Sequence, residues 1–354
     1  MGTTAKRAAV VTLVAGGIVV LALALWKIRV VIALVFLGFI VAAAMRPGVD
    51  WFQRHRLPRS VGVLLHYLAL AGVIALLLWL VVPPAISQVQ QAIGNVPTTS
   101  SELHRQAKQS TGIKHELLLG LEKRLRKLPS GTSLVHPAVE VTKKAFEVLV
   151  GIFFVFAVAA YWIFERDRAI GLVQSLVPRK HRRVARDTWL LIDQKLGAYV
   201  RGSLLLIVFV AVLLSTGFFL IGLPYWLLIG TFAGVVEIVP VIGPLAAGAL
   251  AVGVGLTQSW HMALFAGLIV LGVRQFEDYV VIPRVVGHAV GLSPLIVIFS
   301  VTGIGILLGG FYVLLATPIS AVLATLVDVI VRDVDPAEQD VPAVLFAGAK
   351  EEVG

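Results

Sequence analysis

The sequence predicts an all-α, polytopic integral membrane protein, and two observations support this prediction. Apolar residues make up 58% of the 354 residues and charged residues only 14%, far from the balance of a soluble globular chain. Apolar stretches of about 20 residues, the helical length that crosses a bilayer core of ~30 Å, recur from Ala8 to Val331. We therefore expect about eight transmembrane helices, some broken or re-entrant, together with an amphipathic helical extracytoplasmic segment.

The eight predicted spans form two groups along the chain. The first group comprises 8–26, 30–45, 61–82 and 148–164, and the second comprises 202–222, 225–254, 262–282 and 292–331. The first span is longer than the ~7 to 15 apolar residues of a signal peptide, so we interpret the first two as a retained helical hairpin. The last span is long enough to be two pieces around Gly309, Gly310 and Pro318.

Short basic loops set the expected orientation. The stretches 46–59 and 165–201 are dense in arginine and lysine, which places both in the cytoplasm by the positive-inside rule. The long stretch 83–147 then lies outside, and both termini are cytoplasmic. The expected division of the chain is N-terminal helices 1–82, external segment 83–147, fourth helix with basic loop 148–201, C-terminal transmembrane core 202–331 and cytoplasmic tail 332–354.

Two stretches outside the spans have an amphipathic pattern. Leucines and isoleucines recur at helical spacing between Ile113 and Leu128, beside lysines and arginines. A structural cap packed on its own subunit is the favoured interpretation, and a basic helix that gates an entrance is the alternative. The stretch 178–199 predicts a cytoplasmic interfacial helix that anchors the fifth span.

Several function classes find no support in the sequence. The chain has no cysteine, no GxxxxGK[ST] phosphate loop, no HExxH and no GxSxG motif, so disulfides, ATP hydrolysis and common enzyme chemistry are not predicted. We expect no enzyme activity, no cofactor and no metal site. The net charge of +10 is explained by basic loops that contact anionic lipid, without nucleic acid as a partner.

The sixth span combines a carboxylate with two prolines. Pro240 and Pro244 interrupt an apolar run, with Gly243 between them and Glu237 just before. Proline frees a backbone carbonyl, which inside a bilayer needs protein, water or a ligand as a partner, and broken helices build many transporter sites. Glu237 is therefore a candidate for coupling transport to a proton, while a role in capping the freed backbone is the alternative.

The seventh span carries a charged cluster at its end. Arg274 precedes Glu277 and Asp278 by three and four residues, the spacing of ion pairs on one helix face, and Pro283 and Arg284 follow. A structural ion pair at the membrane edge is the favoured interpretation, and a substrate contact or gate is the alternative.

Glycine pairs spaced by four residues predict close helix packing in the C-terminal half. Such GxxxG pairs let helix backbones approach in lipid, within one subunit or between subunits. They are Gly230 and Gly234, Gly287 and Gly291, and Gly305 and Gly309.

Three motifs in this half resemble the autoinducer-2 exporter family of PerM-like permeases. They are GLPYWLLIGTFAGVVEIVPVIGP at 222–244, QFEDYVVIPRVVGHAVGLSPL at 275–295 and GGFYVLLATPISA at 309–321. Weaker agreement covers nearly the whole chain. The sequence departs from the family pattern at two positions: Val241 stands where members often have tyrosine, and Ser293 stands where histidine is frequent. The resemblance implies a secondary transporter that exports a small molecule, and it is compatible with a homo-oligomer. Some relatives are described as Na+(Li+)/H+ antiporters, and the family name does not assign a substrate.

The predicted function is secondary transport of a small organic or amphiphilic solute across the bacterial inner membrane, coupled to H+ or Na+. The translocation site would lie between the broken helix at 237–244 and the region 274–283, with Glu237 as the coupling group. The alternatives are an Na+(Li+)/H+ antiporter and a non-transporting oligomeric scaffold or lipid-handling protein. Expected partners are membrane lipids, the solute and a second copy of the chain.

Overall fold

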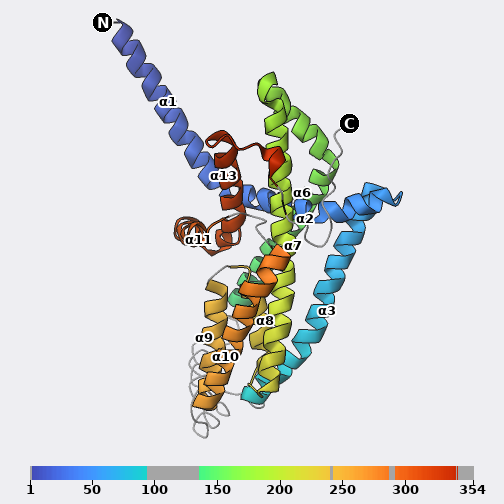
Figure 1. Ribbon diagram of the computed structural model, residues 1–354. Helices are drawn as coiled ribbons and strands as arrows, with labels where there is room; N and C mark the ends of the chain where they lie inside the picture. Colours follow the sequence, from blue (N-terminus) through green and yellow to red (C-terminus); the bar gives the residue numbers. More distant parts are fainter. Residues whose placement is uncertain (1, 94–134, 240–241, 287–291, 340, 342–354) are drawn as a thin grey trace.

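The computed structural model describes residues 2–93, 135–239, 242–286, 292–339 and 341. These residues form helices joined by short turns and contain no strand (Figure 1). Five helices hold stretches long and apolar enough to cross a membrane: Val10–Lys27, Arg29–Arg54, Arg59–Pro84, Phe146–Leu176 and Arg179–Leu220. The predicted class, an all-α polytopic membrane protein, is confirmed.

The N-terminal half is organised around α2 (Arg29–Arg54), which follows α1 (Gly2–Lys27). Helix α2 packs against α3 (Arg59–Ile93), α6 (Val135–Leu176) and α7 (Arg182–Leu220), and Figure 1 shows it crossing the long axis of α7. A Cβ atom added at Gly38 would lie 2.6 Å from Val158 Cγ1, so α2 and α6 approach closely at this glycine. From Val10 onward the apolar side chains of α1 are exposed, as expected for a lipid-facing helix.

The structure corrects the expected loop at 46–59. Helix α2 continues through Pro47 to Arg54, so most of this basic stretch is helical. Pro47 has no N–H group for the carbonyl of Ala43, and such a loss normally kinks or ends a helix. Arg201 of α7 donates from Nη1 to the carbonyl oxygens of Ala43 (3.4 Å) and Ala44 (3.2 Å). A tertiary contact therefore satisfies the carbonyl that the proline frees.

We expect Arg201→Met to lower the free energy of unfolding by about 1 to 3 kcal/mol, the range for hydrogen bonds to charged groups and buried orphaned acceptors. The loss should be smaller in a Pro47→Ala background, because an alanine there restores the backbone donor to the carbonyl of Ala43. Unfolding of the four proteins of this double-mutant cycle in detergent micelles measures the coupling. Equal losses in both backgrounds would show that Arg201 does not compensate for Pro47.

Helices α6 and α7 extend well beyond their predicted spans. Helix α6 is 42 residues long and α7 is 39, and a 3-10 turn at Arg179–His181 lies between them. The expected interfacial helix at 178–199 is thus the first half of α7, continuous with the fifth span. The amphipathic stretch from Ile113 to Leu128 lies outside the described residues.

Each of the last three predicted spans is divided into shorter elements. They are α8 (Trp226–Val236) and α9 (Ile242–Leu256), then α10 (Trp260–Phe276) with a π-helix (Glu277–Val286), then α11 (Pro294–Leu308), α12 (Gly310–Val313) and α13 (Ala316–Ile330). A 15-residue helix such as α9 is about 22 Å long, shorter than a bilayer core of ~30 Å.

Not every proline in these spans interrupts a helix. Pro244 and Pro318 lie in the first turns of α9 and α13, where a missing N–H leaves no carbonyl without its partner. Helix α8 ends at Val236 and residues 237–239 turn away from it, while the break between α11 and α12 falls at Gly309, whose φ of 101° favours glycine.

Helices α7 to α10 share one apolar core. Phe218, Ala251 and Ala266 are fully buried in it. The turn from α7 to α8 has Gly222 (φ 69°) and Tyr225 (φ 58°) in the left-handed region, which reverses the chain so that α8 packs back on α7. Helix α9 packs beside α8 and α10 packs beside α9, so the C-terminal ends of α8 and α10 lie at the same end of the group (Figure 1).

The start of the C-terminal tail contacts α7. A 3-10 turn at Pro336–Glu338 packs against this helix, and Lys195 Nζ donates to Gln339 Oε1 (2.8 Å) and Thr325 Oγ1 (3.1 Å). The tail therefore begins as part of the folded structure.

Candidate functional site

Glu237 lies at the C-terminal end of α8, and Ile238 and Val239 follow it in a turn. The amide of Val239 donates to the carbonyl of Val236 (3.0 Å), and the amide of Gly243 donates to the carbonyl of Val239 (2.9 Å). A Cβ atom added at Gly243 would collide with the carbonyl oxygen of Val236. The tight turn therefore depends on a residue without a side chain at position 243.

Arg274, in the last turn of α10, joins this interruption to the end of α10. Its Nη1 atom lies 3.2 Å from Glu237 Oε1 and 3.3 Å from Glu277 Oε2, and its Nη2 atom lies 3.1 Å from Asp278 Oδ1. Glu277 and Asp278 are the first residues of the π-helix. The two regions singled out in the sequence, 237–244 and 274–283, thus meet at one arginine side chain.

The charges of this cluster do not balance. One guanidinium contacts three carboxyl groups, a formal excess of two negative charges when all are ionised. The side chains of Glu237 and Glu277 are only 8% and 4% exposed, whereas Arg274 and Asp278 are 32% and 40% exposed. Buried charge without a full set of counter-charges is unfavourable, so a proton, a cation or a polar group of a substrate would stabilise the cluster.

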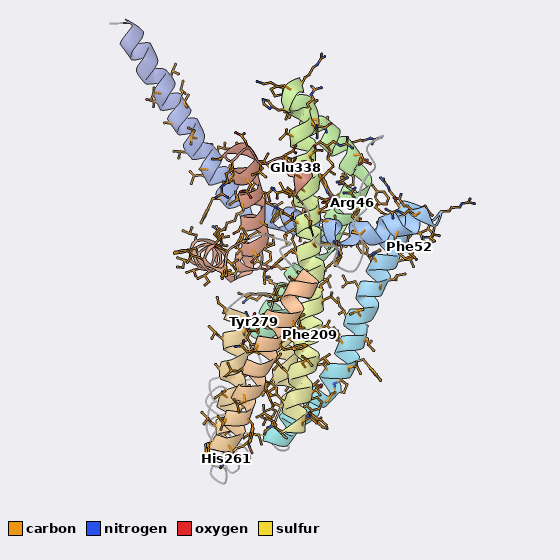
Figure 2. The ribbon with its side chains drawn as sticks, in the orientation of Figure 1. Arg46, Phe52, Phe209, His261, Tyr279 and Glu338 are labelled. Atoms are coloured by element: carbon orange, nitrogen blue, oxygen red, sulfur yellow. The ribbon has the colours of Figure 1, made fainter. Side chains whose placement is uncertain are left out.

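The π-helix that carries two of these carboxylates is itself unusual. π-helices are rare, are mostly single turns and occur frequently at functional sites, whereas this one extends over ten residues from Glu277 to Val286. It packs against α7, near the stacked rings of Phe209 and Phe276, whose centroids are 5.9 Å apart. Figure 2 shows Tyr279 and Phe209 at this end of α10 and His261 at the other end.

The remaining predicted site residues fall into four groups. Gly230 and Gly234 lie where α8 crosses α7, and a Cβ atom at Gly234 would be 2.5 Å from the carbonyl oxygen of Ile207. Gly305 faces Val313 across the turn from α11 to α12, and Gly309 forms that turn. The backbones of Pro283 and Arg284 belong to the π-helix, and the rest lie outside the described residues: Pro240, Gly287 and Gly291.

The structure adds a second charged cluster that sequence reasoning missed. Asp193 Oδ2 accepts from Arg46 (2.9 Å) and lies 3.2 Å from Arg166 Nη2, so α2, α6 and α7 meet at one carboxylate. Residues 46 and 193 are too far apart in sequence for a spacing rule to pair them. The available signal was Asp193 itself, an acidic residue within the basic stretch 165–201. We interpreted that stretch only from the positive charge of its arginines and lysines.

Within the described residues, no group of three or more histidine, cysteine, aspartate or glutamate side chains is arranged to hold a metal ion. In the Arg274 cluster three carboxylates contact one arginine, whose guanidinium supplies the positive charge of the cluster.

Comparison with known proteins identifies the family. Residues 16–332 match the sequence profile described as AI-2E family transporter. The chain belongs to this family. It is 27% identical over 279 residues to YueF of Bacillus subtilis (strain 168), covering 76% of each chain, and YueF is named as a transport protein. It is also 26% identical over 215 residues to PerM of Escherichia coli (strain K12), covering 59% of this chain and 58% of PerM, which is named as a permease.

A third relative extends over more of the chain. MT0215 of Mycobacterium tuberculosis, also named as a transport protein, is 27% identical over 316 residues, with 86% of this chain and 84% of MT0215 covered. The family and the five long apolar helices together establish a multi-pass membrane protein of a transporter family. The profile covers all of the Arg274 cluster.

Proposed function

We propose that this AI-2E family member is a secondary transporter of a small organic or amphiphilic solute across the cytoplasmic membrane, and that the Arg274 cluster couples transport to a cation. One observation carries the proposal: three carboxylates from two separate elements converge on one arginine at an interrupted helix. Ionisable groups inside a membrane protein mark ion or substrate pathways, and interrupted helices build transporter sites.

The arrangement suggests how coupling would work. A proton or Na+ that binds at Glu237 would weaken the contact between Glu237 and Arg274, which is the direct ion pair between the α8–α9 turn and α10. Arg274 would keep Glu277 and Asp278 as partners on its own segment. The α8–α9 turn could then move relative to α10, so that ion binding and solute access change together.

The orientation and assembly belong to the same proposal. The basic stretches 46–59 and 165–201 would face the cytoplasm together with both termini, and copies of the chain would associate in the membrane, with lipids and the solute as the other partners.

An Na+(Li+)/H+ antiporter is the second candidate, and the excess of negative charge at the Arg274 cluster favours it. In that case the solute and the coupling ion would be two cations that compete for the same carboxylates. Movement of protons driven by Na+ or Li+ in everted vesicles, without any organic solute, would distinguish this function from export.

Glu237→Gln is the variant that tests the proposal. Glutamine keeps the shape of the side chain and can still accept a hydrogen bond from Arg274, but it cannot exchange a proton. We expect cation-coupled flux in vesicles, and any solute gradient found by metabolite profiling of intact cells, to fall to the level of cells that lack the protein. The folded fraction should stay unchanged.

Glu165→Gln is the matched control, because it removes the same charge from an ion pair with Arg168, which is 83% exposed. This variant should transport like the original protein. Unaltered flux in Glu237→Gln would remove Glu237 from the mechanism. A purified protein that moves neither ions nor solutes would favour the scaffold or lipid-handling function.

A further inference from the structure

The second charged cluster lines a cavity that the proposed transport site does not use. The cavity has a volume of about 490 Å³ and lies where α2, α3, α6 and α7 meet. In Figure 2, Arg46 marks this region near the crossing of α2 and α7, away from Tyr279. Four arginines line it: Arg46, Arg54, Arg59 and Arg166.

The charged residues of the cavity carry a formal positive excess. Its acidic residues are Asp50, Asp167 and Asp193, which leaves four guanidinium groups against three carboxylates. Asp193 and Arg166 have side chains that are only 9% exposed. The deepest part of the cavity is therefore a network built within the protein.

The contacts in this network hold the guanidinium groups in place. Arg46 and Arg166 share a single oxygen atom of Asp193, at 2.9 and 3.2 Å. Asp167 lies 3.6 Å from Arg59 and 3.7 Å from Arg166, beyond the usual length of a hydrogen bond. Arg54 and Arg59 extend the positive charge from the buried pair to the exposed part of the lining.

The kind of ligand follows from this chemistry. Arginine presents a planar fork of donors that matches phosphate and carboxylate oxygens, and several arginines around one concavity are typical of phosphate recognition. The net positive charge disfavours a cation. Phosphate, with several oxygens, can contact the groups of different helices at once.

The position of the cavity along α2 and α3 adds a second observation. Residues 30–45 and 61–82 lie in two helices that are long and apolar enough to cross a membrane, and Arg46, Arg54 and Arg59 lie in the polar stretch that joins them, which we place at the level of the lipid headgroups. Trp51, on the last turns of α2, is 47% exposed, and exposed tryptophans are enriched at this level of a bilayer. Phosphate groups of lipids are concentrated at the same depth.

We propose that this arginine-lined cavity binds a phosphate-bearing anion, which bridges the arginines of α2, α3 and α6 where these helices meet. The phosphate comes either from the headgroup of an anionic lipid or from a small soluble phosphate compound. In both cases the ligand stabilises the packing of these three helices independently of transport at the Arg274 cluster.

Binding to the purified full-length protein in a non-ionic detergent tests the proposal. The probes are inorganic phosphate, short-chain phosphatidylglycerol and short-chain phosphatidylcholine, the last with a phosphate but no net negative charge. Native mass spectrometry measures binding of each probe, and thermal unfolding measures the stabilisation. We expect phosphatidylglycerol, inorganic phosphate or both to bind and to raise the unfolding temperature, and phosphatidylcholine to do so much less.

The double variant Arg54→Gln/Arg59→Gln should bind the effective probe about tenfold more weakly, the loss expected when charge-assisted hydrogen bonds disappear. The matched control is Arg168→Gln/Arg332→Gln, which removes two exposed arginines elsewhere and should bind the probe unchanged.

Asp50→Asn should bind the effective probe a few-fold more tightly, because it raises the formal positive excess of the cavity.

The outcomes separate the two sources of phosphate. Binding of phosphatidylglycerol alone identifies a lipid headgroup, and binding of inorganic phosphate identifies a site for free phosphate. The proposal is overturned if neither probe binds, if phosphatidylcholine binds equally well, or if the cavity variants and the control variant bind alike.

Discussion

Replacing Arg274 by leucine is expected to destabilise the folded protein more than any other single change considered. The substitution leaves Glu237 and Glu277, whose side chains are 8% and 4% exposed, without the cation that both contact. Removing one partner of a buried ion pair costs about 3 to 5 kcal/mol. The lower end of that range applies because Arg274 itself is 32% exposed. Unfolding of the purified protein in mixed micelles measures this loss.

Two further variants show whether charge is the cause. Combining Arg274→Leu with Glu237→Gln and Glu277→Gln should recover most of the lost free energy of unfolding, because both buried carboxylates are then neutral and the remaining one, Asp278, is 40% exposed. Arg168→Leu should hardly change the free energy of unfolding, because the Arg168 side chain is 83% exposed and its ion pair with Glu165 is screened by water. If the triple variant is as unstable as Arg274→Leu alone, lost packing rather than unbalanced charge would explain the result.

Gly243→Ala is expected to have the second largest effect, and mainly on transport. The new Cβ atom would meet the carbonyl oxygen and carbon of Val236 and, at 3.0 Å, the backbone nitrogen of Glu237. Backbone atoms cannot move aside as a flexible side chain can, so the turn between α8 and α9 must shift. Overpacking of this kind costs about 1 to 3 kcal/mol. A shift of Glu237 would also lengthen its 3.2 Å contact with Arg274.

Gly253→Ala is the matched control on the same helix. No atom lies within 4 Å of a Cβ atom added there, and alanine favours a helix over glycine by about 1 kcal/mol. This control should be as stable as the original protein or slightly more stable, with full transport. Full transport and unchanged stability in Gly243→Ala would show that the close approach to Val236 is not required.

Local spacing predicted those parts of the candidate site that lie on a single element. Arg274, Glu277 and Asp278 are three and four residues apart, and both ion pairs occur in the structure. The interruption of the sixth span was predicted from its prolines, and α8 ends at Val236, shortly before Pro240. The contact between Glu237 and Arg274 joins residues 37 positions apart, so it required the folded arrangement of α8, α9 and α10.

One prediction was wrong and two features were not predicted, because contacts between distant parts of the chain override local sequence preference. The expected loop at 46–59 is largely helix, since Arg201 replaces the donor that Pro47 lacks. The π-helix at the end of α10 has no recognisable sequence signature. The cavity around Asp193 needs arginines from α2, α3 and α6, which no periodicity brings together.

The sequence by itself determined the membrane class, the positions of the long apolar helices, the interrupted C-terminal spans and the carboxylates that make this half a candidate transport region. These follow from hydropathy and from the loss of backbone donors at proline, which act over a few neighbouring residues. Only the tertiary structure decided that three carboxylates share one arginine and that a separate set of arginines surrounds a cavity. Such clusters depend on how helices distant in sequence pack, and side-chain contacts between them leave no local pattern.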